Sequence, residues 1–194
     1  KLSRRNENET PGLDSKTVFS WNAFLGYALY ECYRATGDES LRETADDLVG
    51  AIEDLLKNKS PDDIPHVVYE SGTVRGNRYL QDYAAYLLLL EAIPDRNESI
   101  EQRRTELYRA IQTIFVHDER IWHTDKRMFE SQSLWQDTPF PSGGSILLNA
   151  FGGEDSVQPE LESLLNTNIV DVASSHPMFF SYWLKGYRTR RRVD

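Results

Sequence analysis

The sequence predicts an all-α fold of helical hairpins stacked side by side, with short β-hairpins in the connecting loops. Three motifs stand at nearly equal spacing before apolar helical runs. They are Ser20-Trp21-Asn22, Leu80-Gln81-Asp82-Tyr83-Ala84 and Pro141-Ser142-Gly143-Gly144-Ser145. The intervals are 61 residues from Trp21 to Asp82 and 60 from Asp82 to Ser142. This period is longer than the roughly 34 residues of helical-pair solenoids, so we expect long loops and equivalent hairpin ends that face one shared site.

The composition is that of one globular domain. The chain has 194 residues, of which 39% are hydrophobic and 27% are charged, and this length can bury a single core. The net charge of −9 argues against a nucleic-acid partner or an anionic membrane, because phosphate binding requires a basic surface. No apolar stretch has the length of a membrane span, and no signal-peptide pattern begins the chain. We therefore expect a cytoplasmic location.

The first hairpin is predicted from the helical spacing of apolar residues. Residues 19–35 form one helix, which Gly37 can end as a C-terminal cap. Asp38 is an N-cap for a second helix through Leu56, whose apolar stripe faces inward. Residues 1–18 precede the hairpin as an extended segment.

Pro61 and Pro65 separate this hairpin from the elements that follow. Residues 66–69 are predicted to form a short strand and residues 72–77 a loop. Residues 80–93 are so uniformly apolar that this helix must be buried nearly all round.

The remaining elements alternate between helices and loops. They are an amphipathic helix (99–116), a small β-hairpin (121–129), a loop (130–140), three helices (143–151, 158–166 and 177–187) and a basic, solvated tail (188–194). The most apolar helices begin near residues 20, 80, 143 and 177. These inner helices need a second layer outside them, and concentric helical rings supply one.

Cys32 is the only cysteine, which excludes a disulfide framework, a redox pair and a thiolate zinc site. Its apolar neighbours at helical spacing, Phe24, Leu25, Ala28 and Leu29, predict a buried structural thiol. We expect neither a metal nor a cofactor.

Four segments resemble one protein family. Pro11–Asn22 resembles the Pro-x-x-Asp-Asp-Lys-x-Leu-x-Ser-Trp-Asn segment of YyaL-type thioredoxin-domain-containing proteins, the family that includes spermatogenesis-associated protein 20. Tyr79–Ala84 resembles its Phe-Leu-x-Asp-Tyr-Ala helix start, and Asp137–Ser145 resembles its Asp-Gly-Ala-x-Pro-Ser-Gly-Asn-Ser loop. His176–Phe180 is similar to the start of its last inner helix. The matches are collinear over nearly the whole chain.

The resemblance implies a thioredoxin-like domain followed by an α/α toroid of six helical hairpins, related to N-acylglucosamine 2-epimerases and several glycosidases. Residues 19–187 would be roughly the C-terminal half of that toroid, within a longer protein. Its partners would be the rest of the toroid and the thioredoxin-like domain, or a second copy. Ser15, Thr138 and Gly144 depart from the family's aspartate, glycine and asparagine, and the first and last changes remove polar groups that could line a pocket.

The helix starts supply the candidate site. N-termini of inner helices direct unsatisfied N–H groups and positive dipole ends toward the ring centre, where a sugar could stack on Trp21 and Tyr83. Asp82 is either a general acid or base, or a ligand to sugar hydroxyls, or a carboxylate that complements the first turn of its helix. Asn22 and Ser142 are either substrate ligands or helix caps.

The four histidines divide by position. Related epimerases use histidines to move a proton α to a carbonyl, and His176 is the best placed, beside the start of an inner helix. His66, His117 and His123 lie near outer or loop segments, so we interpret them as structural. No His-Glu-x-x-His pattern is present to bind a metal.

Two functional classes remain open. In the first, the toroid binds and epimerises, isomerises or hydrolyses a carbohydrate; glycosidase chemistry needs two facing carboxylates, for which Glu70 and Asp137 are candidates beside Asp82. In the second, the toroid is a non-catalytic scaffold or binding module of a thioredoxin-domain protein, and its central residues are structural.

Overall fold

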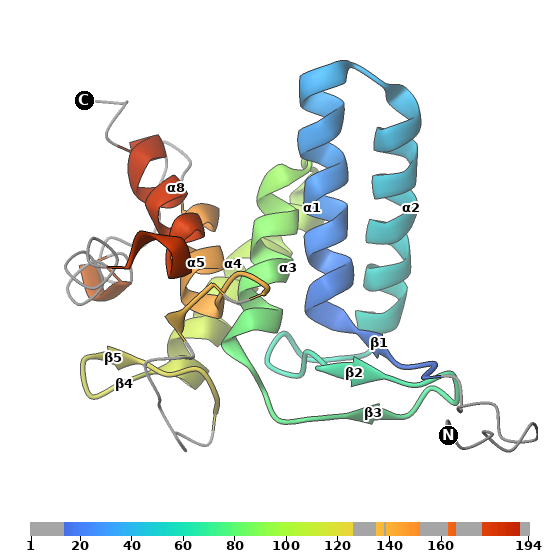
Figure 1. Ribbon diagram of the computed structural model, residues 1–194. Helices are drawn as coiled ribbons and strands as arrows, with labels where there is room; N and C mark the ends of the chain where they lie inside the picture. The colour runs from blue at the N-terminus through green and yellow to red at the C-terminus, as the bar shows by residue number, and fades with distance from the viewer. Residues whose placement is uncertain (1–13, 126–134, 138, 152–162, 166–175, 191–194) are drawn as a thin grey trace, which may run out of the picture.

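The computed structural model describes residues 14–125, 135–137, 139–151, 163–165 and 176–190 (Figure 1). Its helices are α1 (Phe19–Thr36), α2 (Glu39–Leu56), α3 (Leu80–Ala92), α4 (Glu98–Phe115), α5 (Gly143–Ala150), the 3-10 helix η2 (Pro177–Phe179) and α8 (Ser181–Arg190). One antiparallel sheet contains β1 (Thr17–Val18), β2 (Val67–Val68) and β3 (Val74–Arg75), and a second contains β4 (Val116–His117) and β5 (Arg120–Ile121). The predicted all-α class with short β-hairpins is confirmed.

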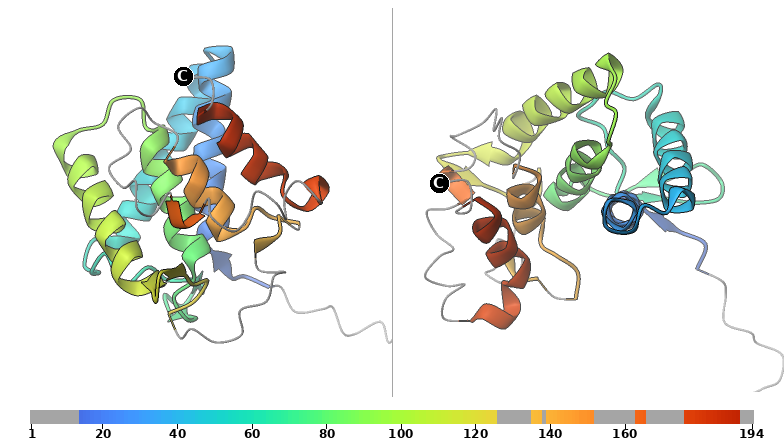
Figure 2. Two further views of the ribbon diagram at one scale, coloured as in Figure 1. Left: turned by 90° about the vertical axis from the view of Figure 1, so that its left-hand side faces the viewer. Right: turned by 90° about the horizontal axis from the view of Figure 1, so that it is seen from above.

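Four helices form a row in which each packs against the next. The order is α1, α3, α5 and α8, and we call this set the inner row. Helix α2 packs against α1 and α4 packs against α3, so both lie outside the row (Figures 1 and 2). This is the two-layer arrangement of inner and outer helices that the sequence predicts.

The two predicted helix caps between α1 and α2 are present in the structure. Gly37 ends α1 in the left-handed region, at a φ of 72°, and its N–H donates to the carbonyl of Tyr33 at 2.7 Å. Glycine adopts this conformation without a steric penalty. The Asp38 carboxylate caps α2 by accepting a hydrogen bond from the N–H of Ser40 at 3.0 Å.

Helix α3 is the centre of the core. Eleven of its thirteen residues are buried, as the uniformly apolar sequence predicts, because α1, α4 and α5 all pack against it. The hydrophobic burial is not directional, so α3 also needs specific contacts at its ends to set its position.

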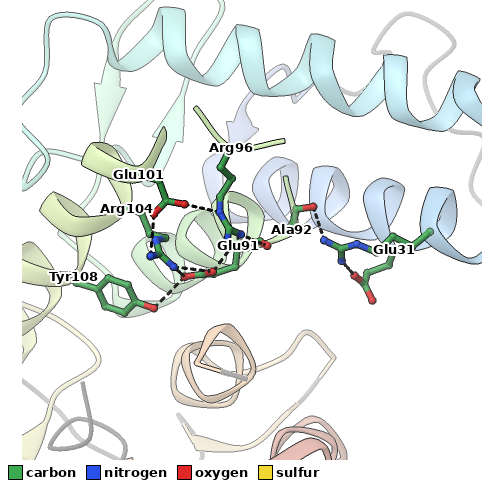
Figure 3. A network of polar contacts seen from close by, with 8 residues as sticks. Glu31, Glu91, Ala92, Arg96, Glu101, Arg104 and Tyr108 are labelled. Carbon is green, nitrogen blue, oxygen red and sulfur yellow. Dashed lines mark hydrogen bonds and ion pairs between the residues drawn. The ribbon is translucent and has the colours of Figure 1, made fainter. Parts of the chain in front are cut away.

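Basic side chains hold the C-terminal end of α3 (Figure 3). Arg34 donates to the carbonyl of Ala92 at 2.6 Å, and Arg96 donates to the carbonyl of Glu91 at 2.9 Å. The Glu91 carboxylate in turn accepts hydrogen bonds from Arg104 at 2.9 and 3.1 Å. Cations at this end complement the negative end of the helix dipole and tie α3 to both α1 and α4.

The strand predicted at residues 66–69 is present as β2, but the predicted 72–77 loop and 121–129 hairpin differ from the structure. Residues 72–77 were expected to be a loop, but they contain β3, which pairs with β2 after a turn at Gly72 with a φ of 75°. The second hairpin begins directly after α4 rather than at residue 121, because Asp118 and Glu119 both adopt positive φ, at 52° and 56°. Two consecutive positive φ values are typical of a two-residue hairpin turn, which usually contains glycine. Part of the predicted 121–129 hairpin lies outside the described residues.

The C-terminal helix differs from the prediction in two ways. The expected 177–187 helix is divided into η2 and α8, because Phe180 between them has φ −134° and ψ 26°, outside the helical region. Helix α8 then continues to Arg190, past the expected boundary with the basic tail. Most of the predicted 158–166 helix lies outside the described residues.

The prediction that Cys32 is buried is wrong, because this thiol is exposed. Helix α1 buries the side that carries Ala23, Gly26 and Tyr30, whereas Leu25, on the Cys32 side, is 53% exposed. No helix within the described residues is long and apolar enough to cross a membrane.

The close contact between α3 and α5 generates a prediction. A Cβ at Gly143 would lie 2.8 Å from the backbone nitrogen of Gln81, so Gly143→Ala must displace one helix. We expect a loss of about 1–3 kcal/mol of unfolding free energy in urea titrations. Gly50→Ala is the matched control: nothing lies within 4 Å of its Cβ position in α2, so alanine should stabilise by about 0.5–1 kcal/mol. An unchanged Gly143→Ala would contradict the close contact.

Candidate functional site

The inner-row helices have their N-terminal ends on the same side of the row, where neighbouring helix starts contact each other. The N–H of Ser20, in the first turn of α1, donates to Oδ1 of Asp82 in the first turn of α3 at 3.2 Å. Beside it, the amide of Gln81 donates to the carbonyl of Pro141, just before α5, at 3.0 Å. The recurring motifs therefore do come together, as their spacing predicts.

The Asp137 carboxylate joins the starts of α5 and α8 in the same way as Asp82 contacts the start of α1. Its Oδ1 accepts hydrogen bonds from the N–H of Ser142 at 3.0 Å and the hydroxyl of Ser145 at 2.6 Å. Its Oδ2 accepts from the N–H of Tyr182 in the first turn of α8 at 2.8 Å. The Ser142 hydroxyl is also the N-cap of α5, accepting from the N–H of Ser145 at 3.2 Å. Asp137 thus joins two helix starts, as Asp82 does.

Asp82 also contacts a histidine that the sequence did not single out. Its Oδ2 lies 2.9 Å from Nδ1 of His66, and the carboxylate is fully buried whereas the His66 side chain is 29% exposed. The hydrogen bond to Asp82 raises the pKa of His66, against the opposing effect of partial burial. With its Nδ1 proton held by Asp82, the neutral imidazole presents Nε2 as a proton acceptor. The pair has the arrangement of an oriented general base.

The backbone around His66 fixes this pair in place. The carbonyl of His66 accepts the first N–H of α1, from Phe19, at 3.0 Å, and its ring packs 4.5 Å from the ring of Tyr79. Gly76 adopts a φ of 119°, and a Cβ there would lie 2.7 Å from Cβ of His66. The strand that follows His66, β2, pairs with β1 immediately before α1. Helices α1 and α2 separate these two strands in the chain, and this long-range pairing, which helical periodicity does not reveal, brings His66 to the helix start.

Trp21 and Asn22 lie at the start of α1, in different surroundings. Trp21 is 59% exposed and stacks on Phe140 with ring centroids 6.4 Å apart. The amide of Asn22 donates to the carbonyl of Val18 at 2.8 Å, a contact within its own helix start. Trp21 therefore offers an open aromatic face beside Ser20, and Asn22 is engaged locally.

The described contacts of Tyr83 and His176 are with residues other than Asp82 and His66. Tyr83 is fully buried, and its hydroxyl donates to the carbonyl of Asp62 at 2.8 Å. Burial raises the pKa of Tyr83, so its phenol stays protonated. His176 is exposed and precedes η2, where its carbonyl accepts from the N–H of Phe179 at 3.0 Å. Neither side chain is brought to Asp82 by a described contact.

Gly144, which stands where the family that the sequence resembles has asparagine, lies beneath two tryptophans. A Cβ at this position would come within 2.5 Å of Trp135 and 2.7 Å of Trp183. The indole N–H of Trp183 donates to the carbonyl of Trp135 at 2.9 Å, which holds both rings there. The space of a polar side chain is therefore filled by aromatic rings.

The other histidines are poorly suited to catalysis. Nε2 of His117 lies 3.1 Å from the carbonyl oxygen of Ile114, and burial lowers the pKa of His123 to about 4.

A cavity of about 580 Å³ lies at the β4–β5 hairpin. It is lined by Val116, His117, Asp118, Glu119, Ser163 and Leu164, none of which belongs to the helix starts described above. We place the candidate site at His66 because the Asp82 carboxylate orients its imidazole. Among the described residues, no three His, Cys, Asp or Glu side chains gather to hold a metal ion.

No protein-family model and no curated protein matches this chain. Membership of the toroid family stays a prediction from the four motifs, and the chemistry of the site has to be derived from its geometry.

The burial of Asp82 predicts the effect of removing its charge. Asp82→Asn preserves size but weakens the contacts with Ser20 and His66, and we expect a loss of about 2 kcal/mol of unfolding free energy. Asp47→Asn, on the exposed side of α2, should change stability by less than about 0.5 kcal/mol. Urea titrations of both variants provide the measurement, and equal effects would show that the Asp82 contacts contribute nothing specific.

The raised pKa of His66 predicts pH-dependent stability. Because the folded-state pKa lies above the ordinary value of 6.5, the contribution of the pair is fully present below that value. It is lost as the pH rises through the folded-state pKa. The Tm difference between the wild type and His66→Gln should therefore be larger near pH 6 than near pH 8.5. The same difference at both pH values would contradict a charged His66–Asp82 pair.

Proposed function

We propose that this chain is part of a carbohydrate-modifying α/α toroid in which His66, oriented by Asp82, transfers a proton at the carbon next to a sugar carbonyl. The observation that carries the proposal is the 2.9 Å contact between a partly exposed imidazole and a fully buried carboxylate. Proton transfer by a positioned histidine accelerates such steps by roughly 10² to 10⁴-fold. The thioredoxin-like domain, which rests on the family resemblance, and the cytoplasmic location, which rests on the sequence pattern, belong to this same proposal.

The carboxylates favour epimerisation or isomerisation over glycoside hydrolysis. A glycosidase needs two carboxyl groups that both reach the substrate. Asp82 is fully buried, and both oxygens of Asp137 accept hydrogen bonds from the chain itself. His66 is the group left with an open nitrogen. It takes the role that the sequence assigned to His176, with Asp82 as the positioning residue.

A sugar is the favoured substrate class because an exposed aromatic ring stands at the start of α1, the helix start that Asp82 binds. Trp21 is adjacent in sequence to Ser20, which Asp82 binds, and its exposed ring is supported from one side by Phe140. A pyranose ring buries its apolar C–H face on such an aromatic surface. Trp21 is therefore the proposed substrate-binding residue.

The second candidate function is a non-catalytic scaffold. It is favoured by one observation: both oxygens of Asp82 and both oxygens of Asp137 are used to join helix starts or to hold His66. In a scaffold, these carboxylates serve only to complement N-terminal N–H groups. The two candidates differ in what His66 does.

Hydrogen exchange of the substrate tests the proposal. The purified protein is incubated in D₂O with N-acyl amino sugars and with free aldoses, and deuterium at the carbon next to the carbonyl is followed by NMR. We expect incorporation with at least one sugar and a loss of roughly 100-fold or more in His66→Gln. His117→Gln is the matched control, because this histidine lies in the β4–β5 hairpin, and it should retain the wild-type rate.

Two outcomes would overturn the catalytic proposal in favour of the scaffold. One is the absence of exchange in the wild type for every sugar tested. The other is equal exchange in His66→Gln and the wild type. A Trp21→Ala variant that exchanges normally at low sugar concentration would remove the aromatic surface from the site.

A further inference from the structure

A single hydrogen bond does not fix the orientation of an imidazole. The contact between Nδ1 of His66 and Oδ2 of Asp82, 2.9 Å long, restrains one atom of the ring. The torsion about the Cβ–Cγ bond of histidine is broad and roughly two-fold, so a flip of the ring would exchange Nδ1 for the ring carbon Cδ2. Because the His66 side chain is 29% exposed, water would accept a hydrogen bond from the displaced Nδ1. Other contacts must therefore hold the ring against such a flip.

Two residues of one short segment supply these contacts. Residues 76–79 lead from β3 to the start of α3 (Figure 1). The ring of Tyr79, at the end of this segment, lies 4.5 Å from the His66 ring between centroids, with the two planes tilted by 49°. At the beginning of the segment, a Cβ on Gly76 would lie 2.7 Å from Cβ, 3.5 Å from Cγ and 3.6 Å from Cδ2 of His66. The imidazole is therefore contacted by an aromatic ring and by backbone that has no room for a side chain.

The backbone of Tyr79 is itself held on two sides. Tyr79 pairs with Thr124 in an antiparallel bridge, and the N–H of the next residue, Leu80, donates to the carbonyl of His123 at 2.9 Å. The carbonyl of Tyr79 accepts a hydrogen bond from the N–H of Asp82 at 3.0 Å. The aromatic ring that packs on the imidazole and the carboxylate that binds it thus belong to one rigid helix start, as a preorganised site requires.

We propose that Tyr79 is a positioning residue for His66, whose ring prevents the flip that would take Nδ1 away from Asp82. His66 then presents Nε2 to a substrate each time. The contact is made between rings, so it needs an aromatic side chain and not the tyrosine hydroxyl. This role rests on the proposed function, because it serves catalysis only if His66 transfers a proton. The orientation of the imidazole can be measured without any substrate.

NMR of the histidine ring nitrogens in the substrate-free protein measures this orientation. At about pH 9, where an imidazole is neutral, wild-type His66 should carry its proton on Nδ1. In Tyr79→Leu, where no ring opposes the flip, the His66 signals should shift toward the tautomer mixture of a solvent-exposed histidine. Tyr79→Phe should restore the wild-type signals. The His66→Gln variant identifies which signals belong to this residue.

Two further variants accompany this measurement. Tyr69→Leu is the matched control, because Tyr69 is 36% exposed and lies three residues after His66, and it should leave the His66 signals unchanged. Gly76→Ala should shift them as Tyr79→Leu does, because the new Cβ must displace His66, and the Tm of each variant shows that it is folded. Wild-type signals in Tyr79→Leu, or a shift in Tyr79→Phe as large as in Tyr79→Leu, would overturn the proposal.

The deuterium exchange of the sugar separates this role from the proposed function. Tyr79→Leu should lower the exchange rate by about 10- to 100-fold, because a base that is misplaced by about 1 Å loses much of its effect, and Tyr79→Phe should retain the wild-type rate. Exchange in the wild type with an unchanged rate in Tyr79→Leu would overturn the positioning role alone. Absence of exchange in the wild type would overturn the proposed function, and the NMR comparison would then decide whether Tyr79 orients His66.

Discussion

The Asp82 carboxylate is the interaction on which the arrangement of the inner row depends. Hydrophobic burial places α3 in the centre of the core but does not set its height or rotation. Asp82 sets both at one end, because its two oxygens bind the start of α1 and the imidazole of His66. At the other end of α3, Arg34 and Arg96 bind the last carbonyls. The helix is thus held by an anion at its positive end and by cations at its negative end.

This dual use of Asp82 links the fold to the candidate chemistry. A carboxylate that must satisfy a helix N–H cannot move freely, so the imidazole that it holds is oriented before any substrate arrives. The same burial prevents Asp82 from touching a substrate itself. His66, which is partly exposed, is left as the group that meets solvent. The structure therefore gives the two residues different positions: Asp82 is buried and supports the imidazole, and His66 is open to solvent.

The sequence predicted the helices and their meeting point well, because the apolar runs around Leu80 and Ile146 and the caps at Gly37 and Asp38 are local signals. The predictions failed where the cause is not local. The turn at Asp118 and Glu119 adopts positive φ without glycine, so no turn residue marks it in the sequence. The apolar residues around Cys32 lie on both the buried and the exposed side of α1, so their spacing does not tell which side Cys32 is on. His66 reaches Asp82 only because β2 pairs with β1. A candidate site that depends on such a pairing cannot be found from the spacing of motifs along the chain.

Gly144 couples the identities of three residues that lie far apart in the sequence. A Cβ at residue 144 would lie 2.5 Å from Trp135 and 2.7 Å from Trp183, so the two rings occupy the volume that any larger side chain there would need. A substitution of Gly144 is therefore tolerated only if one of the tryptophans moves or is itself replaced by a smaller residue. The three positions can change together, but Gly144 cannot change alone without a steric cost.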